Sequence, residues 1–168
     1  MGKTTTCVNL AASLAATRRK VLVIDLDPQG NATMGSGVDK YEVERTAYEL
    51  LIDDAPINEV IIPETSGGYH LIAANADVTA AEIRLMEFFA REIRLRNALA
   101  SVRDKYDYVF IDCPPSLNML TVNAMAAADS VLVPMQCEYY ALEGLTALVD
   151  TISKLAAVVN PELKIEGV

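Results

Sequence analysis

Two short apolar runs, each ending in an aspartate, constrain the fold of this 168-residue chain more than any other feature. They are residues 20–25 (KVLVID) and 107–112 (DYVFID). Both are too short for a helix and rich in β-branched or aromatic residues, which predicts strands buried within a parallel sheet. The carboxyl ends of such strands lie at one edge of the sheet, where ligands of α/β folds bind. We therefore expect Asp25, Asp27 and Asp112 at one functional edge.

Segments with helical and strand-like patterns alternate along the remainder of the chain. Helices are predicted at residues 4–17, 45–52, 77–103 with a break near Phe89, 117–128 and 142–159. Further strands are predicted at 60–62, 69–72, 130–134 and 163–168, the first two as a hairpin-like or offset pair. This alternation indicates a three-layer α/β fold with a mostly parallel sheet, and we expect a single domain over residues 1–168.

The composition excludes several classes of protein. Hydrophobic residues make up 52% of the chain and charged residues 22%, which is enough for a core without disulfide bonds. The three cysteines have no C-x-x-C spacing, and no apolar run is long enough to cross a membrane. With 14 basic and 23 acidic side chains, the net charge of −9 argues against nucleic-acid binding through the overall field. We expect a cytoplasmic chain without stable membrane association.

The segment Gly2-Lys3-Thr4-Thr5 opens the first predicted helix and is typical of the end of a phosphate-binding loop. A helix N-terminus offers unpaired N–H donors and a partial positive charge. A lysine at this place reaches the β- and γ-phosphates of a nucleotide, and the hydroxyl of the next residue ligates Mg²⁺. So short a string also occurs by chance, and the alternative is an ordinary helix with a threonine cap.

The strand-end aspartates add to this segment. An acid at the position of Asp112 can hold the shell of a Mg²⁺ ion, which is the Walker B role. Asp25 and Asp27 point the same way if the chain stays extended, and can hold a metal-bound water or orient an attacking one. The alternatives are a solvated acid at a strand end and turn chemistry around Pro28 and Gly30. Turn chemistry does not explain why a buried strand ends in two carboxylates.

Several strings of residues together resemble the ParA/Soj family of chromosome- and plasmid-partitioning ATPases. The strings are GKTTT (2–6) with VNLA (8–11), VLVIDLDPQGN (21–31), YDYVFIDCPPS (106–116), and VPMQCE (133–138) with ALEGL (141–145). The family belongs to the deviant Walker A class, which also includes MinD-like proteins, and the strings DLDPQGN and IDCPPS favour the partitioning proteins. The resemblance covers essentially the whole chain and implies a P-loop NTPase-like fold.

The resemblance implies ATP and Mg²⁺ as cofactors and ATP hydrolysis as the activity. By the match of residues, Gly2, Lys3, Thr4 and Thr5 would bind the nucleotide. Lys3 would contact the β- and γ-phosphate oxygens and act in catalysis, and Thr5 would meet the α-phosphate. Thr4 would in addition ligate the metal.

The same match assigns the strand-end acids. Asp112 resembles the Walker B acid of the metal site, and Asp25 would lie in the outer shell of the metal. Asp27 resembles the catalytic acid that positions the attacking water. The segment that follows Asp112, residues 113–115, would begin the loop that senses the nucleotide.

The resemblance also implies partners. In this family, ATP drives formation of a homodimer that binds DNA without sequence preference and associates with the nucleoid. A centromere-binding ParB-type protein then stimulates slow hydrolysis. The main DNA-binding basic residues of the family lie beyond the position of Val168, in keeping with the acidic balance of this sequence.

The sequence departs from the family pattern at both ends. The family loop reads Lys-Gly-Gly-x-Gly-Lys-Thr-Thr after a first strand, whereas this sequence begins at Met1-Gly2-Lys3. We therefore expect a domain that is truncated at both ends and lacks the first strand and the C-terminal part of the fold. Two other interpretations stay open: a catalytically silent fragment that acts as an interaction module, and a MinD-like ATPase with a C-terminal amphipathic helix for membranes.

Overall fold

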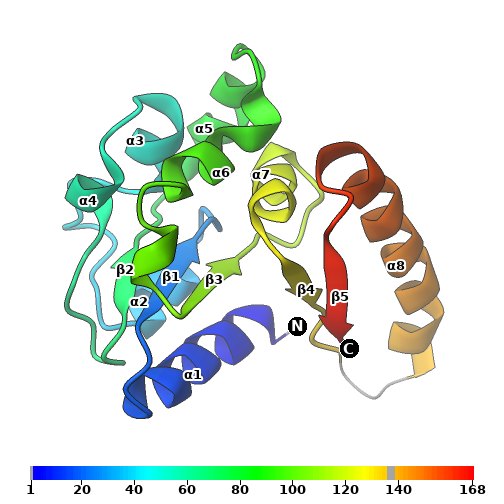
Figure 1. The fold of residues 1–168 in the computed structure, drawn as a ribbon, viewed down its shortest axis with the longest axis horizontal. Coiled ribbons are helices and arrows are strands. Elements are labelled where there is room, and N and C mark those ends of the chain that lie inside the picture. Colours follow the sequence, from blue (N-terminus) through cyan, green and yellow to red (C-terminus); the bar gives the residue numbers. More distant parts are fainter. Residues whose placement is uncertain (1, 136–138) are drawn as a thin grey trace.

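The strands of the computed structural model form two parallel sheets (Figure 1). The structure describes residues 2–135 and 139–168, so residues 136–138 of the VPMQCE string lie outside it. The strands are β1 (Val21–Asp25), β2 (His70–Ile72), β3 (Tyr108–Asp112), β4 (Ser130–Leu132) and β5 (Lys164–Gly167). The first sheet has the order β2-β1-β3, and the second pairs β4 with β5. The expectation of parallel strands is confirmed for both sheets.

Helices connect the strands, as the alternating pattern predicts. The α-helices are α1 (Lys3–Ala16), α2 (Asn31–Gly35), α3 (Ala47–Ile52), α4 (Ile57–Val60), α5 (Val78–Leu85), α6 (Arg94–Leu99), α7 (Met119–Ala127) and α8 (Tyr139–Val159). Two short 3₁₀ helices, η1 (Arg91–Ile93) and η2 (Arg103–Lys105), flank α6. The predicted break near Phe89 falls between α5 and η1. Within the described residues, no helix has the length and apolar character that a membrane crossing requires.

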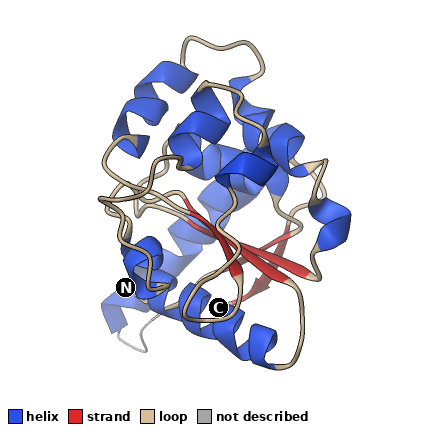
Figure 2. Ribbon diagram, turned by 90° about the vertical axis from the view of Figure 1, so that its left-hand side faces the viewer, coloured by secondary structure: helices blue, strands red, loops and turns tan. Residues whose placement is uncertain are grey.

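The first sheet lies between two layers of helices (Figure 2). Successive side chains of a strand point to opposite faces, and β1 is buried along its whole length. Leu22 and Ile24 pack with apolar residues of α3, α5, α6 and α7, whereas Val21 and Val23 pack with α1. A strand buried on both faces carries a continuous apolar run, which explains the sequence of this strand.

The predicted strand at residues 60–62 is wrong. Residues 57–60 form the short helix α4, which begins after Pro56 and buries Ile57 and Val60 on one side. Side chains three apart share a helix face, so this pair favours the helical turn. Only an isolated antiparallel bridge between Ile62 and Leu71 remains of the predicted strand pair.

The strand β3 is less buried than its sequence predicts. Tyr108 is exposed and Val109, Phe110 and Ile111 are half-buried, in contrast to the fully buried β1. The reason is the pairing, because β3 bonds to β1 on one side and, among the described residues, to no strand on the other. The second sheet is covered by α8, which packs with α7 and β4 in a separate apolar cluster.

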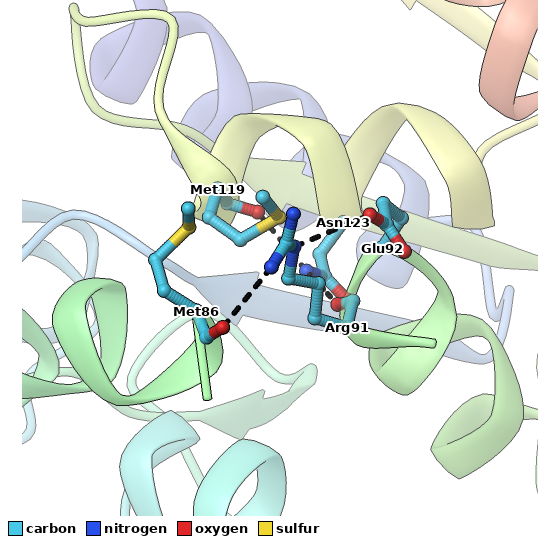
Figure 3. A network of polar contacts seen from close by, with 5 residues as sticks. All are labelled: Met86, Arg91, Glu92, Met119 and Asn123. Carbon is cyan, nitrogen blue, oxygen red and sulfur yellow. Dashed lines mark hydrogen bonds and ion pairs between the residues drawn. The ribbon is translucent and has the colours of Figure 1, made fainter. Parts of the chain in front are cut away.

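A buried asparagine on α7 forms hydrogen bonds to η1 and to the first turn of α6 (Figure 3). Asn123 is fully buried, and its amide nitrogen donates to the backbone oxygens of Arg91 (2.8 Å) and Met119 (3.0 Å). Its side-chain oxygen accepts from the backbone N–H of Leu95 at 3.1 Å. The guanidinium of Arg91 donates to the backbone oxygen of Met86 at 3.0 Å. These bonds satisfy the buried amide and fix the layer of helices above the sheet.

Candidate functional site

The structure brings the carboxyl ends of β1 and β3 together at one edge of the first sheet. Asp25 and Asp112 are register partners on the two paired strands. The backbone N–H of Leu26 donates to the backbone oxygen of Asp112 at 2.9 Å and extends the pairing beyond the strand end. Asp25 is fully buried and Asp112 is 2% exposed. The juxtaposition expected from the sequence is therefore present.

The N-terminus of α1 lies against the end of β3. The hydroxyl of Thr4 donates to Oδ2 of Asp112 at 2.7 Å, across 108 positions of sequence. Gly2 precedes the helix with φ of +95°, a conformation that L side chains rarely adopt, and a Cβ on it would meet no atom within 4 Å. The backbone in front of Lys3 is therefore open, and the first N–H groups of α1 have no partner within the helix.

The carboxylate of Asp25 is occupied by the chain that follows it. Its Oδ1 accepts the backbone N–H of Asp27 at 3.0 Å. Its Oδ2 accepts both the backbone N–H and the hydroxyl of Thr33, each at 2.8 Å. Thr33 lies on the one-turn helix α2 and is fully buried. The predicted place of Asp25 in the outer shell of a metal stays a prediction, and the structure adds a direct role in holding residues 27–33.

Asp27 is half-buried and stands at the start of the loop between β1 and α2. Its Oδ1 accepts the backbone N–H of Gln29 at 3.0 Å, and its backbone oxygen accepts the N–H of Gly30 at 2.8 Å. Such a turn is the local chemistry that Asp and Gly favour. No hydrogen bond to Oδ2 of Asp27 occurs among the described residues, so this oxygen can accept a proton-bearing ligand such as water.

Burial controls the electrostatics of both strand-end acids. Desolvation raises the pKa of Asp25 from 3.8 to about 6, although hydrogen bonds from Thr33 and Asp27 oppose the rise. Desolvation also raises the pKa of Asp112, where the hydrogen bond from Thr4 and the charge of Lys3 act in the opposite direction. The charge of Asp112 adds to the rise at Asp25, and the charge of Asp27 adds to the rise at Asp112, because like charges repel. A cation at this edge would therefore favour the ionised form of Asp112 and relieve its repulsion with Asp27.

Two cysteines border the site. Cys7 on α1 and Cys113 after β3 are half-buried free thiols. Desolvation, together with the charge of Asp112, raises the pKa of both thiols. Thiols of this kind stay protonated and pack as small apolar groups, which agrees with the lack of metal-ligand spacing among the cysteines. Cys137 lies outside the described residues.

One site residue could not be chosen from the sequence, namely Thr33. It binds Asp25 as described, and its hydroxyl oxygen also accepts the backbone N–H of Ala74 at 2.9 Å. A buried carboxylate must find donors nearby, and Thr33 is the first hydroxyl after Asp25 in the sequence. The position of this hydroxyl makes Thr33 a candidate partner of Asp25, but whether the bond forms depends on how the intervening loop folds.

Among the described residues, Thr4 and Asp112 offer adjacent oxygen atoms that could hold a metal ion. Hydroxyl and carboxylate oxygens suit Mg²⁺, which is bound by one or two protein groups together with waters and substrate phosphates. Within the described residues there is no cluster of three or more His, Cys, Asp or Glu side chains that could hold a metal alone. The donor set therefore fits a magnesium ion that arrives with a phosphate ligand.

A parallel α/β sheet with this lysine, threonine and aspartate at its carboxyl edge defines a P-loop NTPase-like fold. The sequence pattern of the AAA domain family matches residues 1–165. The chain therefore belongs to this family of AAA domains, within the group that contains the ParA-type partitioning proteins.

Individual relatives agree with this assignment. The chain is 64% identical to an uncharacterised protein of Pseudomonas putida over 99% of the chain and 64% of that protein. It is 51% identical to the chromosome partitioning protein ParA of Myxococcus xanthus over 100% of the chain and 59% of that protein. The chain thus spans less than two thirds of the length of these relatives.

A solved structure gives the likeness in three dimensions. It is cobyrinic acid a,c-diamide synthase from Mycobacterium smegmatis with a bound ATP analogue and magnesium. The TM-score is 0.92 at 40% identity, over 98% of this chain and 67% of the other. The expected P-loop NTPase-like fold is thereby confirmed.

Proposed function

We propose that this chain is the nucleotide-binding part of a ParA-type ATPase, which hydrolyses ATP with Mg²⁺ and couples hydrolysis to the segregation of chromosomal or plasmid DNA. The observation that carries the proposal is the hydrogen bond from Thr4 to Asp112 at 2.7 Å. The bond joins Thr4, in the first turn of α1, to the acid at the end of β3. Hydroxyl and Walker B carboxylate meet in this way at the magnesium site of P-loop NTPases.

The start of α1 would bind the triphosphate. Gly2 leaves the backbone open, and the free N–H groups of the first turn favour an anion. Lys3 would contact the β- and γ-phosphate oxygens and Thr5, which is exposed, the α-phosphate. Thr4 and Asp112 would hold Mg²⁺, which when bound would supply positive charge that neutralises the phosphate oxygens.

Hydrolysis would consist of in-line attack of water on the γ-phosphorus, with cleavage of its bond to the oxygen that bridges to the β-phosphate. The free oxygen of Asp27 would accept a hydrogen bond from that water and orient it. Lys3 would stabilise the charge that develops on the phosphate oxygens. Catalysis of this type rests on positioning and charge rather than on covalent chemistry.

The proposed coupling to DNA segregation is supported by sequence similarity to partitioning proteins, not by the geometry of the site. The 51% identity to a chromosome partitioning protein supports segregation more strongly than the 40% identity to a diamide synthase supports amide formation. The proposed partners are a second copy bound in the presence of ATP, a centromere-binding ParB-type protein, and DNA without sequence preference. The net charge of −9 argues against a DNA contact through the overall electrostatic field of this chain.

The test is binding and turnover of ATP by the purified chain. We expect Mg²⁺-dependent binding of a fluorescent ATP analogue and slow release of phosphate. Lys3→Ala should weaken binding about 10-fold or more, because it removes charge-assisted hydrogen bonds. Lys154→Ala, which changes an exposed lysine on α8, is the matched control and should bind as the parent does.

The outcome separates the proposal from its alternatives. A chain that binds no nucleotide with or without Mg²⁺ would be a silent interaction module, and the proposal would be wrong for this polypeptide. Binding to lipid vesicles that depends on ATP would favour the MinD-like interpretation instead. Phosphate release equal in the parent and in Lys3→Ala would show that a contaminating enzyme or another site is responsible.

A further inference from the structure

The hydroxyl of Thr33 joins three separate segments of the chain. It donates to Oδ2 of Asp25 at the end of β1 (2.8 Å) and accepts the backbone N–H of Ala74, which follows β2 (2.9 Å). The backbone N–H of Thr33 donates to the same carboxylate oxygen at 2.8 Å. Asp25 and Thr33 are fully buried, so the bonds are shielded from water.

These bonds close a loop around the proposed catalytic acid. The carboxylate of Asp25 binds the backbone N–H of Asp27 through one oxygen and Thr33 through the other. Both ends of the segment 27–33 are therefore held by one side chain. Because Asp27 is the first residue of that segment, its position is set directly by the carboxylate that Thr33 orients.

Residues 27–33 also contact the segment that follows β2. Gly30 has φ of +62°, and a Cβ on it would lie 2.7 Å from the backbone oxygen of Ala74. The same Ala74 donates its N–H to Thr33. The loop and the segment after β2 thus touch at two points, which fixes residues 27–33 against the sheet rather than leaving them as a free loop.

We propose that Thr33 is a positioning residue for ATP hydrolysis, which acts through Asp25 to hold Asp27 where it can orient the attacking water. The inference rests on the proposed function, because it assigns a supporting group to the same site. It separates the strand-end acids by role, since Asp25 would serve the loop and Asp112 the metal. A misplacement of a reacting group by 1 Å can cost about 100-fold in rate, which is the scale of effect such a group controls.

The decisive variant is Thr33→Val, with Thr33→Ser as its conservative counterpart. Valine keeps the shape and the backbone N–H but removes the hydroxyl, so Oδ2 of Asp25 loses one donor and the N–H of Ala74 loses its acceptor. Serine keeps both bonds. Ser36→Ala is the matched control, because Ser36 is a fully buried residue just after α2 whose hydroxyl bonds to Ala32 and Tyr69, not to Asp25.

The first measurement is steady-state turnover with nucleotide affinity and Mg²⁺ half-saturation. Thr33→Val should lower kcat about 10-fold or more while affinity and Mg²⁺ half-saturation stay within about twofold. Thr33→Ser should restore kcat to near the parent value, and Ser36→Ala should leave it unchanged. A loss of kcat that higher Mg²⁺ repairs would overturn the inference, since Thr33 would then act through the metal. An unchanged kcat in Thr33→Val would overturn it equally.

The second measurement does not need activity. Amide hydrogen exchange of the ligand-free chain reports whether Asp27 and Ala74 are held by Thr33. Protection at both amides should fall about 10-fold or more in Thr33→Val and be kept in Thr33→Ser and, at Asp27, in Ser36→Ala. If the parent shows no turnover, the proposed function fails, and exchange alone decides on the loop. Unchanged protection at Asp27 in Thr33→Val would remove the inference in either case.

Discussion

The ends of β1 and β3 carry the same residue in register, yet their surroundings differ. Asp25 at the end of β1 is bonded by its own downstream segment, through the backbone of Asp27 and the backbone and hydroxyl of Thr33. Asp112 at the end of β3 is bonded by Thr4, which lies 108 positions away in the sequence. The first acid accepts three bonds from local donors, and the second accepts a bond from the helix that begins the proposed nucleotide site.

The difference supports separate proposed roles for the two strand ends, with Asp25 holding its own downstream loop and Asp112 holding the metal. A buried carboxylate that already accepts three bonds has room for about one further bond, because its two oxygens offer about four acceptor sites. No bond to Oδ1 of Asp112 occurs among the described residues, so this carboxylate keeps an oxygen for a metal or its water. The strand register thus brings both acids to the same edge of the sheet, and the hydrogen-bond donors around each acid distinguish their proposed roles.

The largest expected effect is on turnover, and it distinguishes Asp27 from the two buried acids Asp25 and Asp112. Asp27→Ala should lower turnover about 1,000-fold, because it removes the group proposed to orient the water, while nucleotide binding stays intact. Phosphate release and analogue binding measure the two properties. Asp104→Ala, at an exposed aspartate in η2, is the control and should behave as the parent. Normal hydrolysis by Asp27→Ala would show that the role is assigned to the wrong residue.

A smaller effect tests the contrast between the two strand ends directly. Asp112→Asn should raise the Mg²⁺ concentration for half-maximal turnover about 10- to 100-fold, because it removes a charged group proposed to hold the metal. Asp25→Asn should leave that concentration unchanged and lower kcat instead, because its proposed target is the loop. Titration of turnover with Mg²⁺ distinguishes them. Equal responses of the two variants to Mg²⁺ would remove the distinction between the strand ends.

The elements that form this edge could be predicted because their patterns are local. The run that became β1 is apolar throughout, and the strand is buried on both faces. The segment at 60–62 has a similar β-branched run, but the strand predicted there is wrong, because Pro56 and the spacing of Ile57 and Val60 favour a helical turn. A short apolar run does not by itself distinguish these states, and the residues before it decide.

The site could be predicted only in part for the same reason. Thr4, Asp25 and Asp112 stand at the ends of predicted elements, so the topology alone brings them to one edge. Thr33 and Ala74 take part through bonds that arise from the path of two loops. A sequence pattern carries the period of a strand or helix, but not the path of a loop.

The smallest expected effect is on stability and depends on pH. Burial raises the pKa of Asp25 to about 6, above its value of 3.8 in an unfolded chain. Between about pH 4 and 6 the folded chain therefore holds a proton that the unfolded chain has lost. The contribution of Asp25 to the free energy of unfolding is thus greatest at low pH and decreases by about 1–3 kcal/mol as pH rises through 6.

Asp25→Asn isolates this contribution, because asparagine carries no charge at any of these pH values. Urea unfolding of the ligand-free chain between pH 4.5 and 7.5 should give a profile for Asp25→Asn that falls less steeply with rising pH than that of the parent. The slopes are compared rather than the absolute values, since asparagine also replaces one acceptor oxygen by a donor that faces N–H groups. Asp104→Asn is the exposed control, and its profile should run parallel to that of the parent. Parallel profiles for the parent and Asp25→Asn would mean that the three hydrogen bonds to this carboxylate fully offset the desolvation caused by its burial. Ionisation of Asp25 would then leave the free energy of unfolding unchanged. Of the two buried strand-end acids, Asp112 would be the one whose ionisation destabilises the fold.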